Sequence, residues 1–169
     1  GYAPGNRTAL RQHLAGHGFT VEAMVESGML IGGDDIPSPY DRFRNRVMFP
    51  IQDTKGRIIA FGGRALDADA PAKYLNSPET PVFDKSRTLY GLDLARKAMA
   101  DSGLAILVEG YIDAAMVCQS GIENVVATLG TALGSRHLDL LRRHEAAQAV
   151  AVDLGAAGLE SRAIGAGPV

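Results

Sequence analysis

Two acids placed four residues apart are the first candidates for a functional site in this chain. Glu109 follows the uninterrupted apolar run from Leu104 to Val108, and Asp113 comes next in the pattern Glu-Gly-x-x-Asp. An apolar run without alternation is typical of a strand buried on both faces, as in a parallel sheet. Open α/β sheets bind ligands at the carboxyl ends of their strands, so we expect both carboxylates at one sheet edge. The plainer alternative is a surface acid after a strand and a first-turn acid favoured by the helix dipole.

A third acid, Asp153, ends a further apolar run over residues 149–152. Carboxylates that meet at one sheet edge suit Mg²⁺, a hard cation that takes oxygen ligands. Such a site near basic and aromatic residues indicates phosphoryl or nucleotidyl transfer. On the pattern alone, ordinary scaffolding of an α/β sheet remains the competing interpretation.

The basic residues gather in the middle of the chain. From Tyr40 to Tyr90 there are nine Lys or Arg against six Asp or Glu, a net charge of +3, whereas the remainder has eight against thirteen, a net charge of −5. A basic segment next to an acidic one suits an anionic substrate on one side and metal cations on the other. Solvated loops would produce the same asymmetry, so this alternative stays open.

The elements that must position these residues read as an α/β fold with an α+β amino-terminal part. Apolar runs at 104–108, 124–131 and 149–153 alternate with helical patterns at 111–120 and 136–144, the second with Ser135 as its cap. This order predicts a β-α-β-α-β parallel sheet with right-handed crossovers. We expect residues 158–164 to add a last helical turn or two.

The amino-terminal half predicts two short helices and a β-hairpin. Asn6 or Thr8 is expected to cap the first helix and Thr20 the second, because short polar side chains accept hydrogen bonds from first-turn N–H groups. The sequence Asp53-Thr54-Lys55-Gly56 predicts the hairpin turn. We expect residues 65–88 to be loop-rich, with no regular helix near Pro78 and Pro81.

Composition bounds the class of protein. The chain has 169 residues, of which 46% are apolar, and its mean hydropathy is near zero, as in globular chains with a core. A single cysteine excludes an internal disulfide framework or zinc knuckle. Nothing resembles a signal peptide or a spanning helix, so we expect a cytoplasmic protein with no membrane partner. The chain has no initiator Met, and we expect it to be part of a longer protein.

Several strings of residues resemble the catalytic core of bacterial primases of the DnaG type. The stretch from Glu109 to Asp113 looks like the glutamate motif of the Toprim fold. The resemblance extends from about Gly1 to about Gly158, and its other strings are residues 42–51 (RFRNRVMFPI), 59–64 (IAFGGR), 73–80 (KYLNSPET), 89–92 (LYGL) and 127–132 (ATLGTA). The implied division is a helical segment (1–38), a basic mixed α/β subdomain (39–102) and a partial Toprim domain (103–169).

The resemblance implies a DNA-directed RNA polymerase, a nucleotidyltransferase that makes short RNA primers on single-stranded DNA from ribonucleoside triphosphates. The implied cofactor is Mg²⁺ or Mn²⁺. By position, Glu109 would be a metal ligand or act as acid and base, Asp113 would support the acidic cluster, and Asp153 would be a metal ligand. Positions that match the nucleotide- and DNA-binding surface of the family are Arg42, Arg44, Arg46, Arg64, Lys73, Tyr74, Asn76 and Lys85.

These binding residues also have plainer interpretations. A lysine or arginine neutralises phosphate and a tyrosine stacks on bases without reading sequence, which agrees with the implied role. Tyr74 packed as a loop anchor, each arginine in a salt bridge or in solvent, and Asn76 bonded to its own turn remain alternatives. The family also implies a replicative helicase as partner and a zinc-binding domain, both through segments outside this chain, and a place in the nucleoid-associated replisome of a bacterium.

One departure from the family pattern bears on activity. Where the family has Asp-Gly-Asp, this chain reads Asp153-Leu154-Gly155, so the second acid is replaced by a residue without a side-chain oxygen. Three functions therefore stay open: templated primer synthesis, a catalytically impaired module that only binds single-stranded DNA, and another Toprim activity such as nuclease or topoisomerase cleavage. The strings specific to primases argue against the third.

Overall fold

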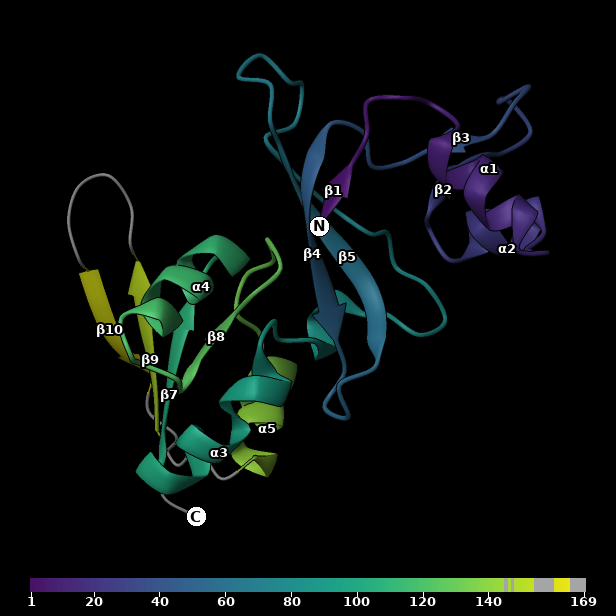
Figure 1. Ribbon diagram of the computed structural model, residues 1–169. Coiled ribbons are helices and arrows are strands. Elements are labelled where there is room, and N and C mark those ends of the chain that lie inside the picture. Colours follow the sequence, from purple (N-terminus) through teal and green to yellow (C-terminus); the bar gives the residue numbers. More distant parts are fainter. Residues whose placement is uncertain (145, 147, 154–159, 165–169) are drawn as a thin grey trace. The chain divides into compact units, whose positions relative to one another are not determined.

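The apolar run Leu104–Val108 forms β7, a strand inside a sheet that has helices on both faces (Figure 1). The structure is a computed structural model that describes residues 1–144, 146, 148–153 and 160–164. Two compact units make up the chain. Unit 1 comprises Gly1–Pro50 and Ala60–Phe83, and unit 2 comprises Ile51–Ile59 and Asp84–Val169. The division into domains at residues 1–38, 39–102 and 103–169 stays a prediction.

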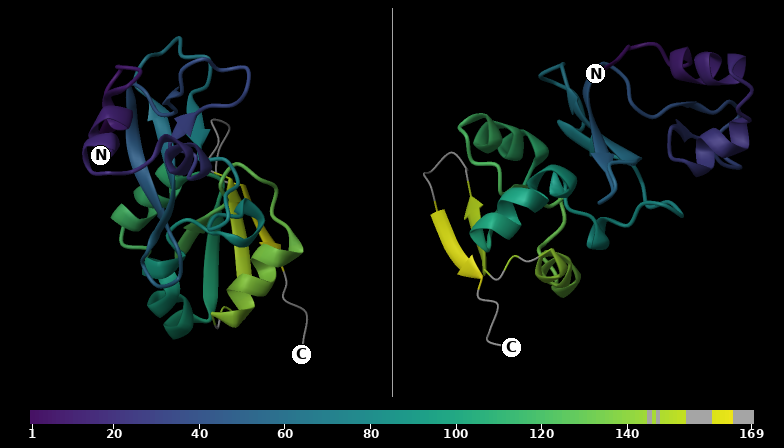
Figure 2. Two further views of the ribbon diagram at one scale, coloured as in Figure 1. Left: turned by 90° about the vertical axis from the view of Figure 1, so that its right-hand side faces the viewer. Right: turned by 60° about the horizontal axis from the view of Figure 1, so that its bottom comes forward.

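Unit 2 contains a four-stranded sheet with the strand order β10-β9-β7-β8. Its helices are α3 (Leu92–Ser102), α4 (Tyr111–Gln119) and α5 (Ser135–Arg143), preceded by the 3-10 turn η1 (Lys85–Arg87). Its other strands are β8 (Val125–Ala127), β9 (Gln148–Asp153) and β10 (Glu160–Ile164). Strand β7 runs parallel to both β8 and β9, which confirms the predicted β-α-β-α-β order; β7 and β9 lie side by side in Figures 1 and 2.

The two faces of this sheet bury different helices, which explains why β7 lacks alternation. Ala105 and Leu107 pack with Met99 of α3 and Leu141 of α5. Val108, the next residue, packs on the other face with Ala114 of α4. The side chains on both faces of β7 are thus in contact with helices and largely out of water, so apolar residues are favoured on both faces and the strand shows no apolar–polar alternation.

Two expectations for unit 2 are wrong. Glu160–Ile164 forms strand β10, antiparallel to β9, instead of the helical turns expected over 158–164. Strand β10 covers an edge of β9 that would otherwise be open, and this pairing depends on a contact between two segments. A prediction from local helical periodicity takes no account of such a contact. The cap of α5 is Gly134 rather than Ser135, and Nδ1 of His137 accepts from the N–H of Gly134.

Unit 1 begins with α1 (Ala9–Gly16) and α2 (Val21–Glu26), followed by β2 (Leu30–Ile31) paired with β3 (Tyr40–Asp41). The hydroxyl of Thr20 accepts from Ala23 N at 3.3 Å, which confirms the predicted cap of α2. Of the two residues expected to cap α1, Thr8 makes no side-chain cap bond, whereas Oδ1 of Asn6 accepts from Thr8 N at 2.7 Å, just before the helix. The first-turn N–H groups of Leu10 and Arg11 donate to the carboxylate of Asp41, at 2.7 Å and 3.0 Å.

A second four-stranded sheet has the strand order β1-β4-β5-β6. Its strands are β1 (Tyr2–Ala3), β4 (Arg46–Gln52), β5 (Ile58–Ala65) and β6 (Tyr74–Asn76). Asp53 and Gly56 close the turn between β4 and β5, so the predicted hairpin is confirmed. The short strand β6 pairs with β5 inside the stretch that was expected to be loop-rich. No helix in the described part of the chain is long and apolar enough to cross a membrane.

Candidate functional site

Glu109 follows directly after β7, and its side chain is exposed. Its backbone carbonyl accepts from the Thr128 hydroxyl at 3.4 Å, and Thr128 N donates to Val108 O at 3.1 Å. These two bonds tie the ends of β7 and β8 together. The Glu109 carboxylate therefore extends into solvent from a backbone that its neighbours hold in place.

Asp113 lies in the first turn of α4, and its carboxylate lies close to the backbone of Gly110. A Cβ atom at position 110 would come within 3.0 Å of Oδ2 of Asp113. Gly110 has φ −129° and ψ 156°, a backbone conformation that other residues adopt as readily. A side chain at position 110 would therefore crowd the end of the Asp113 side chain, which would have to shift by a few tenths of an ångström, and the second acid lies next to the residue that follows Glu109.

Asp153 reaches the same edge through the register of the strands. Leu107 pairs with Ala151, and Glu109 and Asp153 each come two residues later on parallel neighbouring strands. Adjacent strands are about 4.8 Å apart, so the two positions are neighbours at one level of the sheet. The side chain of Asp153 and the substituted positions Leu154 and Gly155 lie outside the described residues.

The donor set at this edge fits a hard divalent cation. Two carboxylates are described, and the backbone of β9 brings the third acid to their level, so the available ligands are oxygens. Within the described residues, no three side chains of His, Cys, Asp or Glu are grouped to hold a metal ion.

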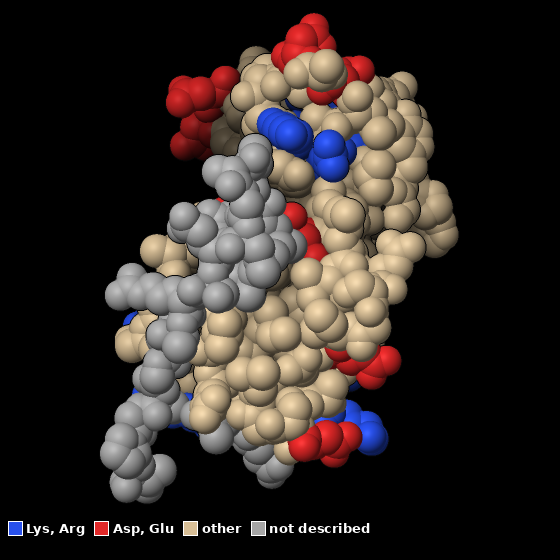
Figure 3. Space-filling model, turned by 90° about the vertical axis from the view of Figure 1, so that its left-hand side faces the viewer, with Lys and Arg blue, Asp and Glu red and all other residues tan. Residues whose placement is uncertain are grey.

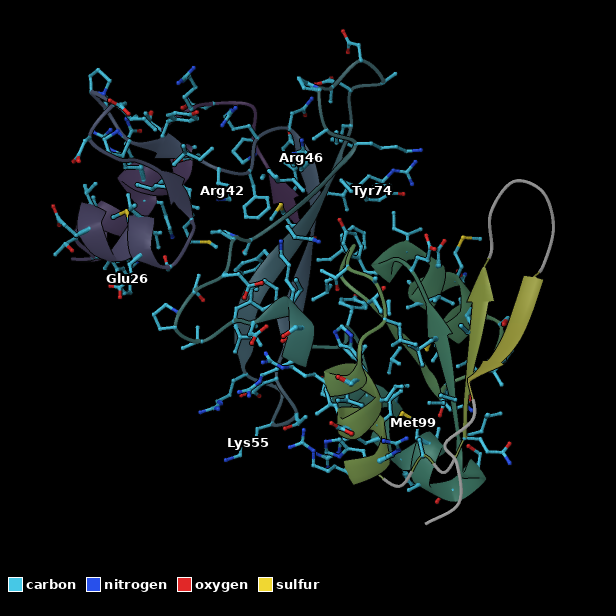
Figure 4. The ribbon with its side chains drawn as sticks, turned by 180° about the vertical axis from the view of Figure 1, so that it is seen from behind. Glu26, Arg42, Arg46, Lys55, Tyr74 and Met99 are labelled. Atoms are coloured by element: carbon cyan, nitrogen blue, oxygen red, sulfur yellow. The ribbon has the colours of Figure 1, made fainter. Side chains whose placement is uncertain are left out.

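Among the residues expected to bind nucleic acid, Tyr74 has an exposed aromatic side chain. Its side chain is 47% exposed on β6, the edge strand of the hairpin sheet, and Figure 4 labels it. The guanidinium carbon of Arg64 and Nζ of Lys73 both lie 5.8 Å from the centre of its ring. Arg64 is the cross-strand partner of Tyr74 in β5, and Lys73 precedes it. An accessible aromatic ring beside two cations can stack a base while the cations contact phosphate.

The three arginines between positions 42 and 46, the last of which begins β4, donate to backbone carbonyls of unit 1. Nε of Arg42 donates to Gly28 O at 2.9 Å, and burial lowers the pKa of its guanidinium. Arg44 donates to Asp41 O and lies 5.0 Å from the Tyr40 ring centre. Arg46 is 8% exposed, and its guanidinium donates to the carbonyls of Gly63, Ala72 and Lys73 (Figure 4). These bonds hold loops together, which favours a positioning role over direct phosphate contact for Arg46.

The two remaining candidates lie in different units. Asn76 in unit 1 is half-buried and pairs with Gly62 across β5 and β6. Lys85 in unit 2 opens η1, and its carbonyl accepts from Nε2 of His137 at 2.8 Å. On the face drawn in Figure 3, basic side chains form small separate groups, one of them beside acidic side chains.

Sequence reasoning missed two buried polar residues that hold together the elements around the candidate binding residues. Asp41 is 2% exposed and caps α1 from another segment. His137 is 1% exposed and joins α5 to η1. The only local signal for His137 was its place three residues after Gly134, where a polar side chain can reach back to the helix start.

Two protein families match the chain. Residues 1–96, more than half of the chain, match the family described as the N-terminal domain of the DNA primase catalytic core, and residues 106–164 match the Toprim-like family.

The similar proteins and solved structures described next are DNA primases or parts of them. A DNA primase of Pseudomonas aeruginosa is 52% identical over 143 residues, which cover 85% of this chain and 21% of that protein. The RNA polymerase domain of Mycobacterium tuberculosis primase DnaG, in complex with a double-stranded DNA oligomer with a 6-nucleotide overhang, is 38% identical with a TM-score of 0.79, over 86% of this chain and 45% of that one. A DnaG primase catalytic domain bound to single-stranded DNA is 35% identical with a TM-score of 0.79, and the match covers 94% of this chain and 60% of that one. The chain thus spans about a fifth of the length of the first of these relatives.

Proposed function

Because this chain belongs to the DNA primase catalytic-core family, we propose that it forms part of a DNA-directed RNA polymerase that makes short RNA primers on a single-stranded DNA template. The observation that carries this proposal is the acidic edge of the β7 sheet. Glu109 lies at the carboxyl end of the strand, with Asp113 over the adjacent glycine and Asp153 at the same level of β9. Ribonucleoside triphosphates are the substrates, and the RNA primer is the product.

Glu109 and Asp153 would hold Mg²⁺ or Mn²⁺, and Asp113 would complete the acidic cluster. A bound divalent ion supplies charge that stabilises the phosphate oxygens of the reacting nucleotide. Glu109 is exposed and so accessible to a nucleotide, and it can also accept or donate a proton. The two hydrogen bonds that join the ends of β7 and β8 keep the backbone of Glu109 in place during the reaction.

The aromatic and basic candidate residues bind the nucleic acid. Tyr74 stacks on a base of the template or primer, and Arg64, Lys73 and Lys85 contact phosphates. Arg42, Arg44 and Arg46 shape the same surface of unit 1 through their bonds to backbone carbonyls, and Asn76 holds β6 beside β5. The complex structures of related primases with DNA support a DNA template as partner. The setting we propose is the bacterial cytoplasm, at the replisome with the replicative helicase.

A specific observation favours a second candidate function. The chain has Gly155 where related sequences are expected to have the second acid of an Asp-x-Asp motif. Losing one of a few carboxylates weakens a metal position, and the basic surface with Tyr74 does not depend on it. A module that binds single-stranded DNA without making primer would retain all of that surface.

The experiment that separates these functions is primer synthesis on single-stranded DNA with ribonucleotides and Mg²⁺ or Mn²⁺. It compares full-length primase carrying this catalytic-core sequence with its Gly155→Asp variant, each with and without EDTA. Metal-dependent synthesis from the unaltered protein supports the enzyme. Template binding without synthesis, with synthesis restored by Gly155→Asp, supports the binding module. A folded protein that makes no primer in either form contradicts primer synthesis.

A further inference from the structure

We propose that His137 is a positioning residue for Lys85: its buried imidazole joins the first turn of α5 to the 3-10 turn η1 and sets the backbone from which the Lys85 side chain departs. The inference deepens the proposed function and rests on it, because Lys85 matters only if it contacts a nucleotide or template phosphate. His137 is distant from Lys85 in the sequence and is not itself placed against substrate.

The hydrogen bonds of His137 assign one state to its ring. The side chain is 1% exposed. Gly134 N can only donate, so Nδ1, at 3.2 Å, must accept. The proton of the neutral ring therefore lies on Nε2, which donates to Lys85 O at 2.8 Å. Both ring nitrogens have a partner, as a buried polar side chain requires.

The contact adds a shorter hydrogen bond to the one that the turn already makes at the Lys85 carbonyl. Lys85 O also accepts from Thr88 N, but at 3.5 Å, which is the longer of the two distances. The imidazole thus provides the better hydrogen bond to this carbonyl. Without it the peptide between residues 85 and 86 is held less firmly, and rotation of that peptide changes the direction of the Lys85 side chain.

A second contact joins the same two elements at the surface. Arg136 donates to the Ser86 hydroxyl at 3.1 Å and lies 3.7 Å from Oδ2 of Asp84. The Asp84 carboxylate accepts from the backbone N and the hydroxyl of Ser86, and the side-chain hydrogen bond from Ser86 is the main cause that lowers the pKa of Asp84. Two consecutive residues of α5 therefore hold η1, one buried and one exposed.

The place of His137 on α5 argues for a specific role. Leu141, one turn later on the same helix, is 1% exposed and packs in the core of unit 2. An apolar residue at position 137 would extend that packing without the cost of burying a ring with two polar atoms. What the imidazole adds is the pair of directed bonds, one to its own helix start and one to the backbone of Lys85.

Two substitutions separate these bonds. The amide of Asn reaches about as far as Nδ1, so His137→Asn keeps an acceptor for Gly134 and loses the donor to Lys85. The amide of Gln reaches about as far as Nε2, so His137→Gln keeps the donor and loses the acceptor. In full-length primase we expect His137→Asn to raise KM for ribonucleotides or Kd for single-stranded template on the order of tenfold, the equivalent of one neutral hydrogen bond. His137→Gln should stay close to the unaltered protein.

The control and the double mutant test whether the effect passes through Lys85. His144 lies at the end of the same helix and is not part of the proposed contact, so His144→Gln should change nothing. Lys85→Ala should weaken binding, and adding His137→Asn to it should cause no further loss. Equal losses from the Asn and Gln variants, additive losses in the double mutant, or normal synthesis by Lys85→Ala would each overturn the inference.

Hydrogen exchange gives a readout that does not need activity. His137→Asn should speed exchange at the amides of residues 86–88, and His137→Gln should not. If this difference is present but the unaltered protein makes no primer, the contact between α5 and η1 is supported and the proposed function fails. If exchange at these amides is the same in both variants, the positioning inference fails.

Discussion

Tyr74 shows how a single exposed ring can be read at the scale of the residue. Tyr74 is 47% exposed, with Arg64 and Lys73 both 5.8 Å from its ring centre, so about half of its surface stays in contact with water and accessible to a base. The cations keep the ring in an electropositive surface. Stacking and phosphate contact are therefore available at one position of the edge strand β6.

Replacing this ring should weaken binding of single-stranded DNA. Removing a stacked aromatic costs about 1–3 kcal/mol per base, so we expect Tyr74→Ala to raise Kd roughly 5- to 150-fold, whereas Tyr74→Phe keeps most of the affinity. Fluorescence anisotropy with a labelled oligonucleotide measures both. Phe19→Ala removes a similarly exposed aromatic side chain, at 58%, and should have no effect. Equal affinities for Tyr74→Ala and the unaltered protein would remove Tyr74 from the interface.

Gly110 allows a second prediction at this scale. Its backbone is ordinary, but an added Cβ would lie 3.0 Å from Oδ2 of Asp113. Gly110→Ala should therefore displace that carboxylate and lower primer synthesis with little change in the unfolding midpoint. In an Asp113→Ala background the same substitution should cost nothing more, because the crowded oxygen is gone. Gly16→Ala, where nothing lies within 4 Å, is the control. Additive losses would show that Gly110 acts in another way.

At the scale of the element, the turn of the β4–β5 hairpin depends on one carboxylate. Asp53 accepts from Lys55 N at 2.9 Å and Arg57 N at 3.0 Å, and pairs with the Arg57 guanidinium at 2.6 Å. The side-chain hydrogen bond from Arg57 is the main cause that lowers the pKa of Asp53 below its usual 3.8. A lowered folded-state pKa means that the unfolded chain binds the proton more readily. The turn is therefore stabilised above pH 3.8, and this is lost as the pH falls below it.

Asp53→Asn should remove this pH-dependent part of the stability. At pH 7 the variant should unfold at lower urea concentration than the unaltered protein, and the two midpoints should converge as the pH is lowered through and below 3.8. Urea titrations across that range measure the difference. A difference that is the same at pH 7 and pH 3 would mean that the ionised carboxylate is not what stabilises the turn.

Elements also decide what the arginines do. The string 42–46 reads as a basic surface, yet Arg42 and Arg46 donate to backbone carbonyls from distant parts of unit 1. Burial of Arg46 to 8% exposure follows from the pairing of β5 with β6 and from the loop before it. A charged residue carries no local sign that three carbonyls will surround it, so this role could not be predicted from the sequence.

At the scale of the whole molecule, the sheet that contains β7 was the most predictable part. The unbroken apolar run of β7 indicates burial on both faces, and the spacing between the apolar runs indicates helical crossovers between parallel strands. The positions of Glu109 and Asp113 followed from the end of that run and the helix after it. Contacts between segments were not predictable: β10 pairs with β9, β6 pairs with β5, and Asp41 caps α1 across about 30 residues.

The measurement that tests the central claim most directly is primer synthesis by a Glu109→Gln variant of full-length primase carrying this sequence. A carboxylate that binds metal or transfers a proton should be worth about 10²-fold or more in rate. We predict at least that loss, with affinity for single-stranded DNA unchanged, because the stacking surface at Tyr74 is left intact. Glu123→Gln removes an exposed acid elsewhere in unit 2 and should keep full activity. Synthesis by Glu109→Gln at the rate of the unaltered protein would contradict a catalytic site at the end of β7.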